Sequence, residues 1–482
     1  MYCGIDLGTT NIKIAIYSED FKLIDRQSRP VEYIRDGGFV EFNAVTYCEI
    51  LVDLLNDMVK ENNIKVIRQI AFTGQAESLV VLGADGNPLM NAISWMDERS
   101  TEECKILEKQ FSHEICEAVT GQMAVLPTWP ATKILWLQKN KPDVYAAADT
   151  YMLLKDYVVF YLTGEKKCDM SIATFSFYFD IYKKCYWEAM LDAIGVKLSQ
   201  LPELVEPCTV AGTLKAKLVP TLEPGTAVNV GTLDHFAGMI GTGNIEAGGV
   251  TLSTGTVMAM AVMADESMSH NTGIAMHYGF LPNTHVMLPV VESGGVSLEW
   301  FRRACMKNIT YDEMNATLAR RERNDLLFLP YLVGTNAPEF DAEAKGVFWG
   351  LRQEHDCIDM AGSIMEGVGY VLQKNLQHIH KNGIQLQNII ATGGGAKSPI
   401  WCQLYADITG LPVRIPAEKE AACLGAAMIA AVADGKYADF ETASKELVAF
   451  SMEYAPHPCE HYERKYRRFC KLYEAALAIN EI

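Results

Sequence analysis

The chain has 482 residues and carries 42 lysines and arginines against 60 aspartates and glutamates, a net charge of −18. This length exceeds what a single hydrophobic core sustains and is typical of two domains. So acidic a chain argues against nucleic acid or an anionic membrane as a partner, because both are bound through basic surface. No run of about 18 apolar residues predicts a membrane span, and Met1 leads directly into an apolar strand rather than a leader peptide.

The 13 cysteines are scattered, without a CxxC pair. An odd number without paired spacing predicts reduced thiols and a cytoplasmic location, and it argues against a zinc site.

Two short apolar strands, Tyr2–Ile5 and Ile12–Tyr17, are predicted at the N-terminus. The turn that joins them contains Asp6, Gly8, Thr9 and Thr10. Backbone amides and hydroxyls donate hydrogen bonds to phosphate, and a carboxylate can hold the water of a bound magnesium ion. The turn therefore suits a magnesium-bound phosphate chain, although an ordinary N-terminal hairpin would have the same residues.

The same pattern returns in 249–262, where a turn with Gly255 and Thr256 joins two apolar stretches. Two such hairpins predict two similar domains, residues 1–243 and 244–482, that face each other across a cleft and offer one tip each to the same nucleotide. The glycine-rich stretch 241–248 is the predicted hinge.

Polar residues follow two strands predicted at 66–73 and 93–95. They are candidates for gripping a small polar ligand, because such groups gather at strand ends: Gln75, Ala76, Glu77, Trp95, Asp97 and Arg99. The alternative is that Asp97 and Arg99 pair on the surface and that Trp95 belongs to the core.

Further along, helices are predicted at 128–140, with Pro130 in the first turn, and at 151–161, ending at Gly164. The aromatic-rich region 168–205 is interpreted as a lid or an insertion over the ligand.

Asp234 follows a predicted strand, 227–230, and precedes a helix of small residues, 236–240. A carboxylate at this position can be an N-cap that the helix dipole favours. It can also be a base that approaches a substrate hydroxyl, and position alone leaves both open. His235 is more typical of a structural neighbour than of a second catalyst.

In the C-terminal half, 293–296 precedes a helix that carries Glu299, and a strand at 389–391 runs into three glycines. Ser398 followed by Pro399 is a strong helix start. A strand, a glycine turn and a helix N-terminus together are typical of a nucleotide or anion site, although the spacing fits neither the P-loop nor GxGxxG.

These motifs together resemble those of the FGGY family of carbohydrate kinases over nearly the whole chain. Residues 346–351, 359–360 and 363–366 fit the family's C-terminal signature, and 128–140 fits its other signature except at Thr128. Residues 6–10 resemble the family's first phosphate loop, Gly255 and Thr256 its second, and 392–401 the adenosine loop of xylulokinases. Asp234, in GTLDHFAG, falls on the family's general base.

The resemblance implies an α/β fold of two actin-like (RNase H-like) ATPase domains that transfer the γ-phosphate of MgATP to a small sugar. The family also suggests a homodimer. Magnesium would lie near Asp6 and Asp234. The residues expected at the nucleotide are Gly8, Thr9, Thr10, Lys13, Gly255, Thr256, Gly295, Glu299, Gly393, Gly394, Gly395 and Ser398. Those expected at the sugar are Gln75, Ala76, Glu77, Trp95, Asp97, Arg99, Asp234 and His235.

The sugar loops depart from the subfamilies. Glu77 falls where glycerol kinases have a glutamate, but Ala76 replaces their arginine and Thr128 their tyrosine, and xylulokinases usually have histidine in place of Glu77. A ketopentose such as xylulose or ribulose is therefore the predicted substrate, with a shorter polyol as the alternative. A non-kinase actin-like ATPase would have the same hairpins, but it would not need the polar cluster or Asp234.

Overall fold

The computed structural model describes residues 1–265, 272–457 and 459–480. These residues form two compact units. The first unit contains Met1–Ile245, Ala275–Val286 and Glu420–Val448, and the second contains Glu246–Ile274, Met287–Lys419 and Ala449–Ile482. Two segments that follow residue 243 in the sequence therefore pack within the first unit.

The first unit is built on a six-stranded sheet in the order β14-β15-β6-β1-β2-β3. β1 runs antiparallel to β2, which forms the predicted hairpin, and parallel to β6, which in turn runs parallel to β15. Every residue of β1 and β6 is buried, as expected of central strands covered on both faces. The bounds are β1 Tyr2–Leu7, β2 Asn11–Tyr17, β3 Leu23–Pro30, β6 Gln69–Gly74, β14 Val210–Thr213 and β15 Ala227–Leu233.

A second sheet of this unit has the order β4-β5-β8-β7-β9. Its last strand corrects a prediction: Tyr151–Leu153, expected to begin a helix, are in β9 and pair with β7, and α6 begins only at Leu154. The bounds are β4 Ile34–Asp36, β5 Phe39–Phe42, β7 Leu79–Leu82, β8 Ala92–Ile93 and β9 Thr150–Leu153. The two-stranded sheets are β10 Lys167–Asp169 with β13 Glu203–Val205, and β11 Phe179–Asp180 with β12 Cys185–Tyr186.

The helices of the first unit begin where the local sequence allows. The side chain of Asn43 caps α1 by accepting from the amides of Val45 and Thr46, and Pro130 is the first residue of α4. The helices are α1 Ala44–Glu61, α2 Thr101–Gln110, α3 His113–Thr120, α4 Pro130–Asn140, α5 Pro142–Ala147, α6 Leu154–Thr163, α7 Met170–Ala173, α8 Glu188–Ile194, α9 Asp234–Thr242, α14 Ala421–Ala433 and α15 Phe440–Leu447.

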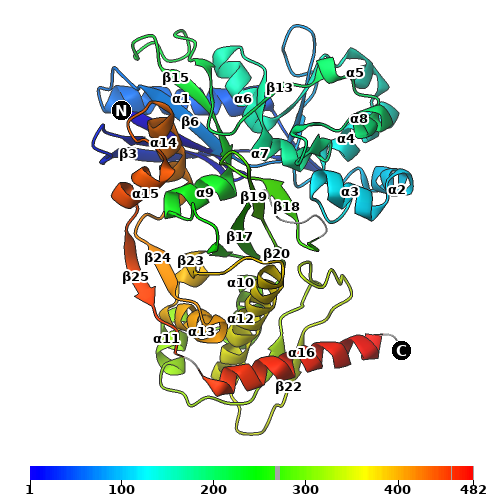
Figure 1. Ribbon diagram of the computed structural model, residues 1–482, viewed down its shortest axis with the longest axis vertical. Coiled ribbons are helices and arrows are strands. Elements are labelled where there is room, and N and C mark those ends of the chain that lie inside the picture. The colour runs from blue at the N-terminus through cyan, green and yellow to red at the C-terminus, as the bar shows by residue number, and fades with distance from the viewer. Residues whose placement is uncertain (266–271, 458, 481–482) are drawn as a thin grey trace. The chain divides into compact units, whose positions relative to one another are not determined.

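Helices α9 and α14 lie side by side in the first unit (Figure 1) and approach closely because small residues line their contact. A Cβ added to Gly241 would stand 1.9 Å from the carbonyl oxygen of Ala421, and one added to Gly425 would stand 1.9 Å from that of Ala237. Gly241, which falls in the stretch predicted as a hinge, is thus a buried packing position at the end of a helix.

The second unit repeats the strand plan. β17 and β16 form the second predicted hairpin, β16 runs parallel to β23, and β23 runs parallel to β24. β25 pairs with β24 at one edge, β20 pairs with β17, and β21 pairs with β22. The bounds are β16 Gly249–Thr254, β17 Met258–Asp265, β20 Val290–Val291, β21 Leu327–Leu329, β22 Val347–Trp349, β23 Asn388–Gly393, β24 Val413–Pro416 and β25 Phe450–Tyr454. The helices are α10 Gly295–Cys305, α11 Tyr311–Leu318, α12 Cys357–Lys381, α13 Pro399–Thr409 and α16 Glu460–Asn480.

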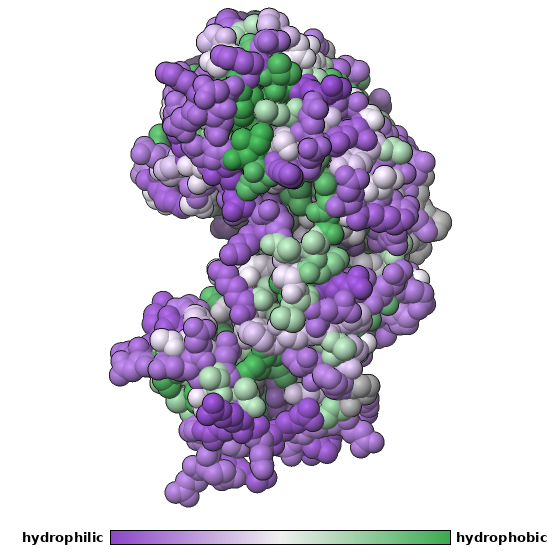
Figure 2. All heavy atoms as spheres, turned by 90° about the vertical axis from the view of Figure 1, so that its left-hand side faces the viewer, coloured by the Kyte–Doolittle hydropathy of each residue, from purple (hydrophilic) through white to green (hydrophobic). Residues whose placement is uncertain are grey.

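The surface agrees with the acidic, polar composition. On the face in Figure 2, hydrophilic residues predominate and hydrophobic residues form short strips among them. None of the helices that the structure describes has the length and apolar character needed to cross a membrane.

Candidate active site

Three residues predicted to act in catalysis and binding come to one edge of the first unit's sheet. β1, β6 and β15 are parallel neighbours, so their carboxyl ends meet at the same edge. Asp6 lies near the end of β1, Gln75 directly follows β6, and Asp234 directly follows β15 as the first residue of α9. The strand order therefore brings together two carboxylates that are 228 positions apart in the sequence, as residue numbers 234 and 6 show.

The path of β15 into α9 depends on a glycine. Gly231 has a φ of +71°, and a Cβ there would stand 1.5 Å from the carbonyl oxygen of Phe72 in β6. Only glycine fits this conformation at this distance, and the register between β15 and β6 shifts here, between Asn229 and Thr232. The glycine thus sets the direction in which Asp234 leaves the sheet.

Asp6 has an unusual electrostatic environment. The pKa of Asp6 is raised to about 7, chiefly by burial and in addition by the nearby carboxylates of Asp234 and Glu420, while Lys13 opposes them. The Lys13 ammonium lies 3.8 Å from Asp6 Oδ2 and 2.8 Å from Glu420 Oε2. Two carboxylates and one shared ammonium leave an excess of negative charge at this edge.

The loops that follow β6 and β8 are hydrogen-bonded to the first hairpin turn. The indole N–H of Trp95 donates to Thr9 Oγ1 at 2.9 Å, and the Gln75 amide nitrogen lies 3.4 Å from the carbonyl oxygen of Gly8. Ser78 joins the two loops, because its hydroxyl donates to Gln75 Oε1 at 2.8 Å and accepts from the Trp95 backbone amide at 3.1 Å. Trp95 is 39% exposed, so its ring is a surface on which a ligand can pack and not a core residue.

Glu77 is held in a left-handed conformation, with a φ of +64°, which is rare for residues other than glycine. Lys133 of α4 supports this turn from below: it is fully buried and donates to the carbonyl oxygens of Glu77 at 3.0 Å and of Ser94 at 2.8 Å. Burial raises the pKa of Glu77 and lowers the pKa of Lys133, and each charge partly offsets the shift of the other. Sequence reasoning gave Lys133 no role, although a lysine in the apolar stretch 130–137 was a signal.

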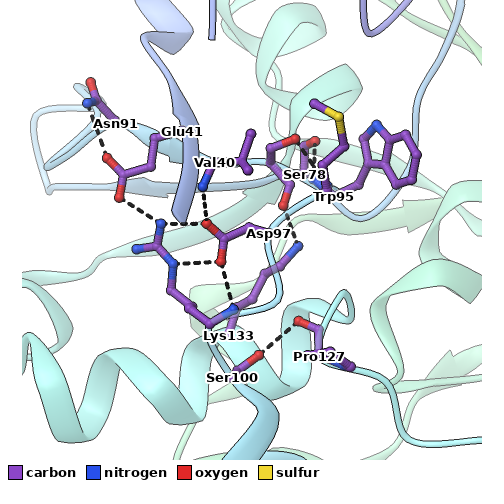
Figure 3. A network of polar contacts seen from close by, with 12 residues as sticks. Val40, Glu41, Ser78, Asn91, Trp95, Asp97, Ser100, Pro127 and Lys133 are labelled. Carbon is purple, nitrogen blue, oxygen red and sulfur yellow. Dashed lines mark hydrogen bonds and ion pairs between the residues drawn. The ribbon is translucent and has the colours of Figure 1, made fainter. Parts of the chain in front are cut away.

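Asp97 and Arg99 form a buried ion pair (Figure 3). The guanidinium donates to both oxygens of Asp97 at 2.7 Å, and Asp97 also accepts from the amide of Val40 at 2.5 Å. The same guanidinium donates to Glu41 at 2.8 Å.

The Arg99 guanidinium also stacks over the ring of Phe39, with 4.2 Å to the centroid, and the side chain is 1% exposed. Because the hydrogen bonds of Arg99 go to protein carboxylates, the geometry gives Arg99 and Asp97 the role of fixing the loop that carries Trp95.

The remaining candidates for the sugar are His235, which follows Asp234, and Ala76, which follows Gln75, and both are partly buried. A second histidine, His277, was not predicted: its ring is buried, stacks on Phe175 at 4.4 Å and 9°, and contacts Gln122 through Nδ1. Burial lowers the pKa of His277 to about 3, so it stays neutral.

Phe175 belongs to the region 168–205, interpreted from the sequence as a lid or an insertion. Its aromatic side chains Phe175, Phe177, Tyr178 and Phe179 are buried in the first unit. These side chains are therefore part of a core and do not form an exposed flap.

The second unit has a cavity of about 530 Å³ where the nucleotide residues were predicted. The β16–β17 turn, the N-terminus of α10 and the loop after β23 line this cavity. Its lining includes the predicted Gly255, Thr256, Gly295, Glu299, Gly394, Gly395 and Ser398, and also Lys397 and Trp401 of the predicted adenosine loop. Tyr311, Asp312 and Asn315 line it as well and were not predicted. Gly393 is absent from the lining and takes a φ of +76° at the end of β23.

Backbone contacts shape this cavity. The amide of Gly295, at the start of α10, donates to the carbonyl oxygen of Gly255 at 2.8 Å, and that of Val296 donates to Thr256 at 3.1 Å. On the other side, the Ser398 hydroxyl caps α13 and donates to Asn315 Oδ1 at 3.0 Å. Apolar walls with a few fixed polar groups are typical of a nucleoside site.

The Glu299 side chain faces this cavity but is engaged: it accepts from Tyr311 at 2.6 Å and from Arg302 at 3.0 Å. Glu299 and Tyr311 thus connect α10 to α11 at the cavity wall.

A preformed metal cage is absent from the described residues, where no three His, Cys, Asp or Glu side chains are grouped to hold an ion. Magnesium bound with a nucleotide needs no such cage, because phosphates and water supply most of its ligands and one or two carboxylates suffice. The excess negative charge at Asp6 and Asp234 fits such an ion.

Comparison with known proteins gives a consistent result. Residues 1–241 match the N-terminal domain and residues 250–433 the C-terminal domain of the FGGY family of carbohydrate kinases. The chain is 29% identical to xylulose kinase of Escherichia coli, with 90% of each covered, and 27% identical to gluconokinase of Bacillus licheniformis, with 98% and 94% covered. The solved structure of ligand-bound xylulose kinase from Lactobacillus acidophilus superposes with a TM-score of 0.91 at 26% identity, covering 99% of this chain and 98% of that one. The two-domain actin-like α/β fold predicted from the sequence is confirmed.

Proposed function

The chain belongs to the FGGY family of carbohydrate kinases, and we propose that it phosphorylates a neutral ketopentose such as xylulose or ribulose. As a member of this family it is a carbohydrate kinase that uses ATP as co-substrate. The proposal concerns the acceptor sugar and the residues that act on it.

The observation that carries the proposal is the position of Asp234 at the sheet edge beside Asp6 and the first hairpin turn. Asp234 accepts a hydrogen bond from the amide of His235 at 2.6 Å, which orients one oxygen. The other oxygen is available to take a proton from a sugar hydroxyl as that hydroxyl attacks the γ-phosphate. Asp234 is therefore the proposed general base.

Magnesium is the metal that we propose at this edge, near Asp6 and Asp234. When bound with ATP it supplies positive charge that screens the phosphates. Asp6, buried and raised in pKa by Asp234, is the group that would orient the metal's water, and the amides of Gly8 and Thr9 would donate to phosphate oxygens.

The charges of the sugar loops favour a neutral acceptor. Arg99 is held by Asp97 and Glu41, and Lys133 donates to two carbonyl oxygens. Neither cation is available to a substrate carboxylate. A gluconate-like acceptor, the class named for one relative, is therefore disfavoured.

A ketopentose fits better than a shorter polyol for two reasons. Two xylulose kinases are similar over nearly the whole chain, and the residues that glycerol kinases use beside their glutamate are replaced here by Ala76 and Thr128. Trp95 offers a half-exposed ring on which a sugar's carbon face can pack.

The test is ADP formation with D-xylulose, D-ribulose, glycerol, erythritol or D-gluconate as acceptor. The proposal predicts that a ketopentose gives the highest kcat/KM, with one phosphate transferred for each ADP formed. A higher kcat/KM with gluconate or glycerol would contradict the proposed acceptor, and hydrolysis without any acceptor would contradict the assignment of Asp234 as base.

A further inference from the structure

A second large cavity of the second unit lies apart from the nucleotide cavity. Its volume is about 860 Å³, and none of its lining residues lines the nucleotide cavity. Three segments form it: the loop between α11 and β21, the end of β22 with the residues that follow, and one face of α16. The lining is Arg320, Arg321, Glu322, Arg323, Asn324, Asp325, Trp349, Gly350, Arg352, Glu354, His355, Asp359, His461, Arg464 and Arg468.

The charge of this lining is opposite in sign to that of the whole chain. Six arginines face four carboxylates, a balance of +2 before either histidine is counted, whereas the chain carries −18. Arginines gathered in one concave site are the usual means of holding phosphate, because the guanidinium presents paired donors.

Three of the arginines are already engaged. Arg321 pairs with Asp356, and Arg464 donates to Asp325 at 3.3 Å. The guanidinium of Arg323 stacks over the Tyr462 ring at 5.0 Å.

The other three arginines have donors to spare. Among the described residues, Arg320 is exposed and its guanidinium makes no hydrogen bond or ion pair. Arg352 is 71% exposed and lies 3.7 Å from Glu354, beyond hydrogen-bond distance. Arg468 shares a single carboxylate, Asp325, with Arg464 at 3.4 Å.

Two further groups complete the cavity. His461 accepts from Arg464 at Nδ1, so its proton is on Nε2, and this buried nitrogen has no hydrogen-bond partner among the described residues. Trp349 is 50% exposed at the end of β22. A large exposed ring beside unoccupied cationic donors suits a ligand with both an anionic group and a carbon skeleton.

We propose that this cavity binds a phosphate monoester of a small polyhydroxylated molecule, with the phosphate between Arg320, Arg352 and Arg468 and the carbon skeleton against Trp349. A kinase of this family forms molecules of that chemical class, so the site would sense a sugar phosphate at a distance from the chemistry. The proposal does not depend on which sugar the enzyme phosphorylates.

The experiment is isothermal titration of the full chain, saturated with a non-hydrolysable ATP analogue, with ribose 5-phosphate or inorganic phosphate at constant ionic strength. The test variant is Arg320→Gln with Arg468→Gln. We expect it to weaken binding of both probes by about tenfold or more, because it removes two charged hydrogen-bond donors. Trp349→Ala should weaken ribose 5-phosphate binding and leave inorganic phosphate binding unchanged.

The matched control is Arg467→Gln with Lys471→Gln. Both residues are exposed on the same helix, α16, lie outside the cavity lining and change the net charge equally. Retained binding in this control supports a specific site, and equal weakening in both double variants would overturn it as general screening. Binding that survives Arg320→Gln with Arg468→Gln would place the probe elsewhere and overturn the proposal. Equal affinity for both probes would overturn the assignment of a sugar phosphate.

Discussion

Each unit has a parallel strand pair beside its hairpin, β1 with β6 and β16 with β23. The two pairs end in the same register, but the residues at two equivalent positions differ. In the first unit Asp6 pairs with Thr73 and Leu7 with Gly74, and in the second Ser253 pairs with Thr392 and Thr254 with Gly393. Each hairpin then continues with Gly-Thr, at Gly8 and at Gly255. The register thus aligns Asp6 with Ser253 and Gln75 with Gly394.

The residues at these two equivalent positions distinguish the two units. At the Asp6 position the first unit has a buried carboxylate whose pKa is raised to about 7, and the second has a serine. At the Gln75 position the first unit has a side chain that hydrogen-bonds Ser78, Tyr33 and Gly8, and the second has a glycine beside a cavity of about 530 Å³. The same strand plan therefore ends in a buried carboxylate in one unit and beside a glycine-lined cavity in the other.

The largest expected effect is that of Asp234→Asn. Asparagine preserves the volume but cannot accept the proton of the sugar hydroxyl, so kcat should fall by about 10²- to 10⁴-fold. Steady-state ADP formation measures this loss. ATP affinity, measured by titration of the variant, should be unchanged, and a variant that retains wild-type kcat would refute the role of this residue.

Arg99→Met tests the ion pair that fixes the Trp95 loop. It leaves Asp97 buried without its partner, so the free energy of unfolding should fall by about 3–5 kcal/mol. Urea denaturation monitored by fluorescence measures it. The control is Arg26→Met, an exposed arginine in β3 of the same unit, which should cost less than about 1 kcal/mol. An equal loss of unfolding free energy in the two variants would show that the buried pair of Arg99 and Asp97 stabilises the fold no more than an exposed arginine does.

Gly394→Gln gives the second unit the side chain that the first unit has at the equivalent position, Gln75. Gly394 has a φ of −66°, and a Cβ there would meet only the carbonyl oxygen of Thr254 at 3.5 Å, so the fold should tolerate it. The rest of the side chain would enter the nucleotide cavity and raise KM for ATP by about tenfold or more. Gly38→Gln, in an open turn with no atom within 4 Å of a Cβ, is the control. Unchanged KM for ATP in Gly394→Gln would show that the cavity does not hold the nucleotide.

Trp95→Phe should have the smallest effect. It keeps an aromatic ring but removes the hydrogen bond to Thr9, worth about 0.5–1.5 kcal/mol, so KM for the sugar should rise by about two- to tenfold. Trp300→Phe, at a tryptophan of similar exposure in α10, serves as the comparison. A sugar KM that responds equally to both variants would exclude the specific contact.

The sequence predicted the elements that rest on local signals. The two hairpins, the Ser398 cap and the glycine that ends α6 were readable because turns and caps depend on neighbouring residues. Residues 151–153 were assigned to a helix because their apolar run continues into one, and only pairing with β7 makes them a strand. That pairing is non-local and leaves no trace in the spacing of the sequence.

The site residues were likewise predictable only where a local signal marks them. Asp6, Gln75 and Asp234 were candidates because each follows a predicted strand, and the nearness of Asp6 and Asp234 was implied only by the resemblance to the family. The sequence does not show whether a charged side chain of the site contacts a ligand or another side chain of the protein. Asp97 and Arg99 pair with each other and with Glu41, and Lys133 supports Glu77 through carbonyl oxygens that no sequence motif specifies.

The most direct test measures Asp234→Asn and Gly394→Gln side by side, with kcat and the KM for ATP determined at a saturating ketopentose. If the first unit carries the proton transfer and the second binds the nucleotide, Asp234→Asn should lower kcat with little change in the KM for ATP. Gly394→Gln should instead raise the KM for ATP and approach wild-type kcat when ATP is saturating. If both variants changed the same parameter, the proposed separation of proton transfer from nucleotide binding would be contradicted.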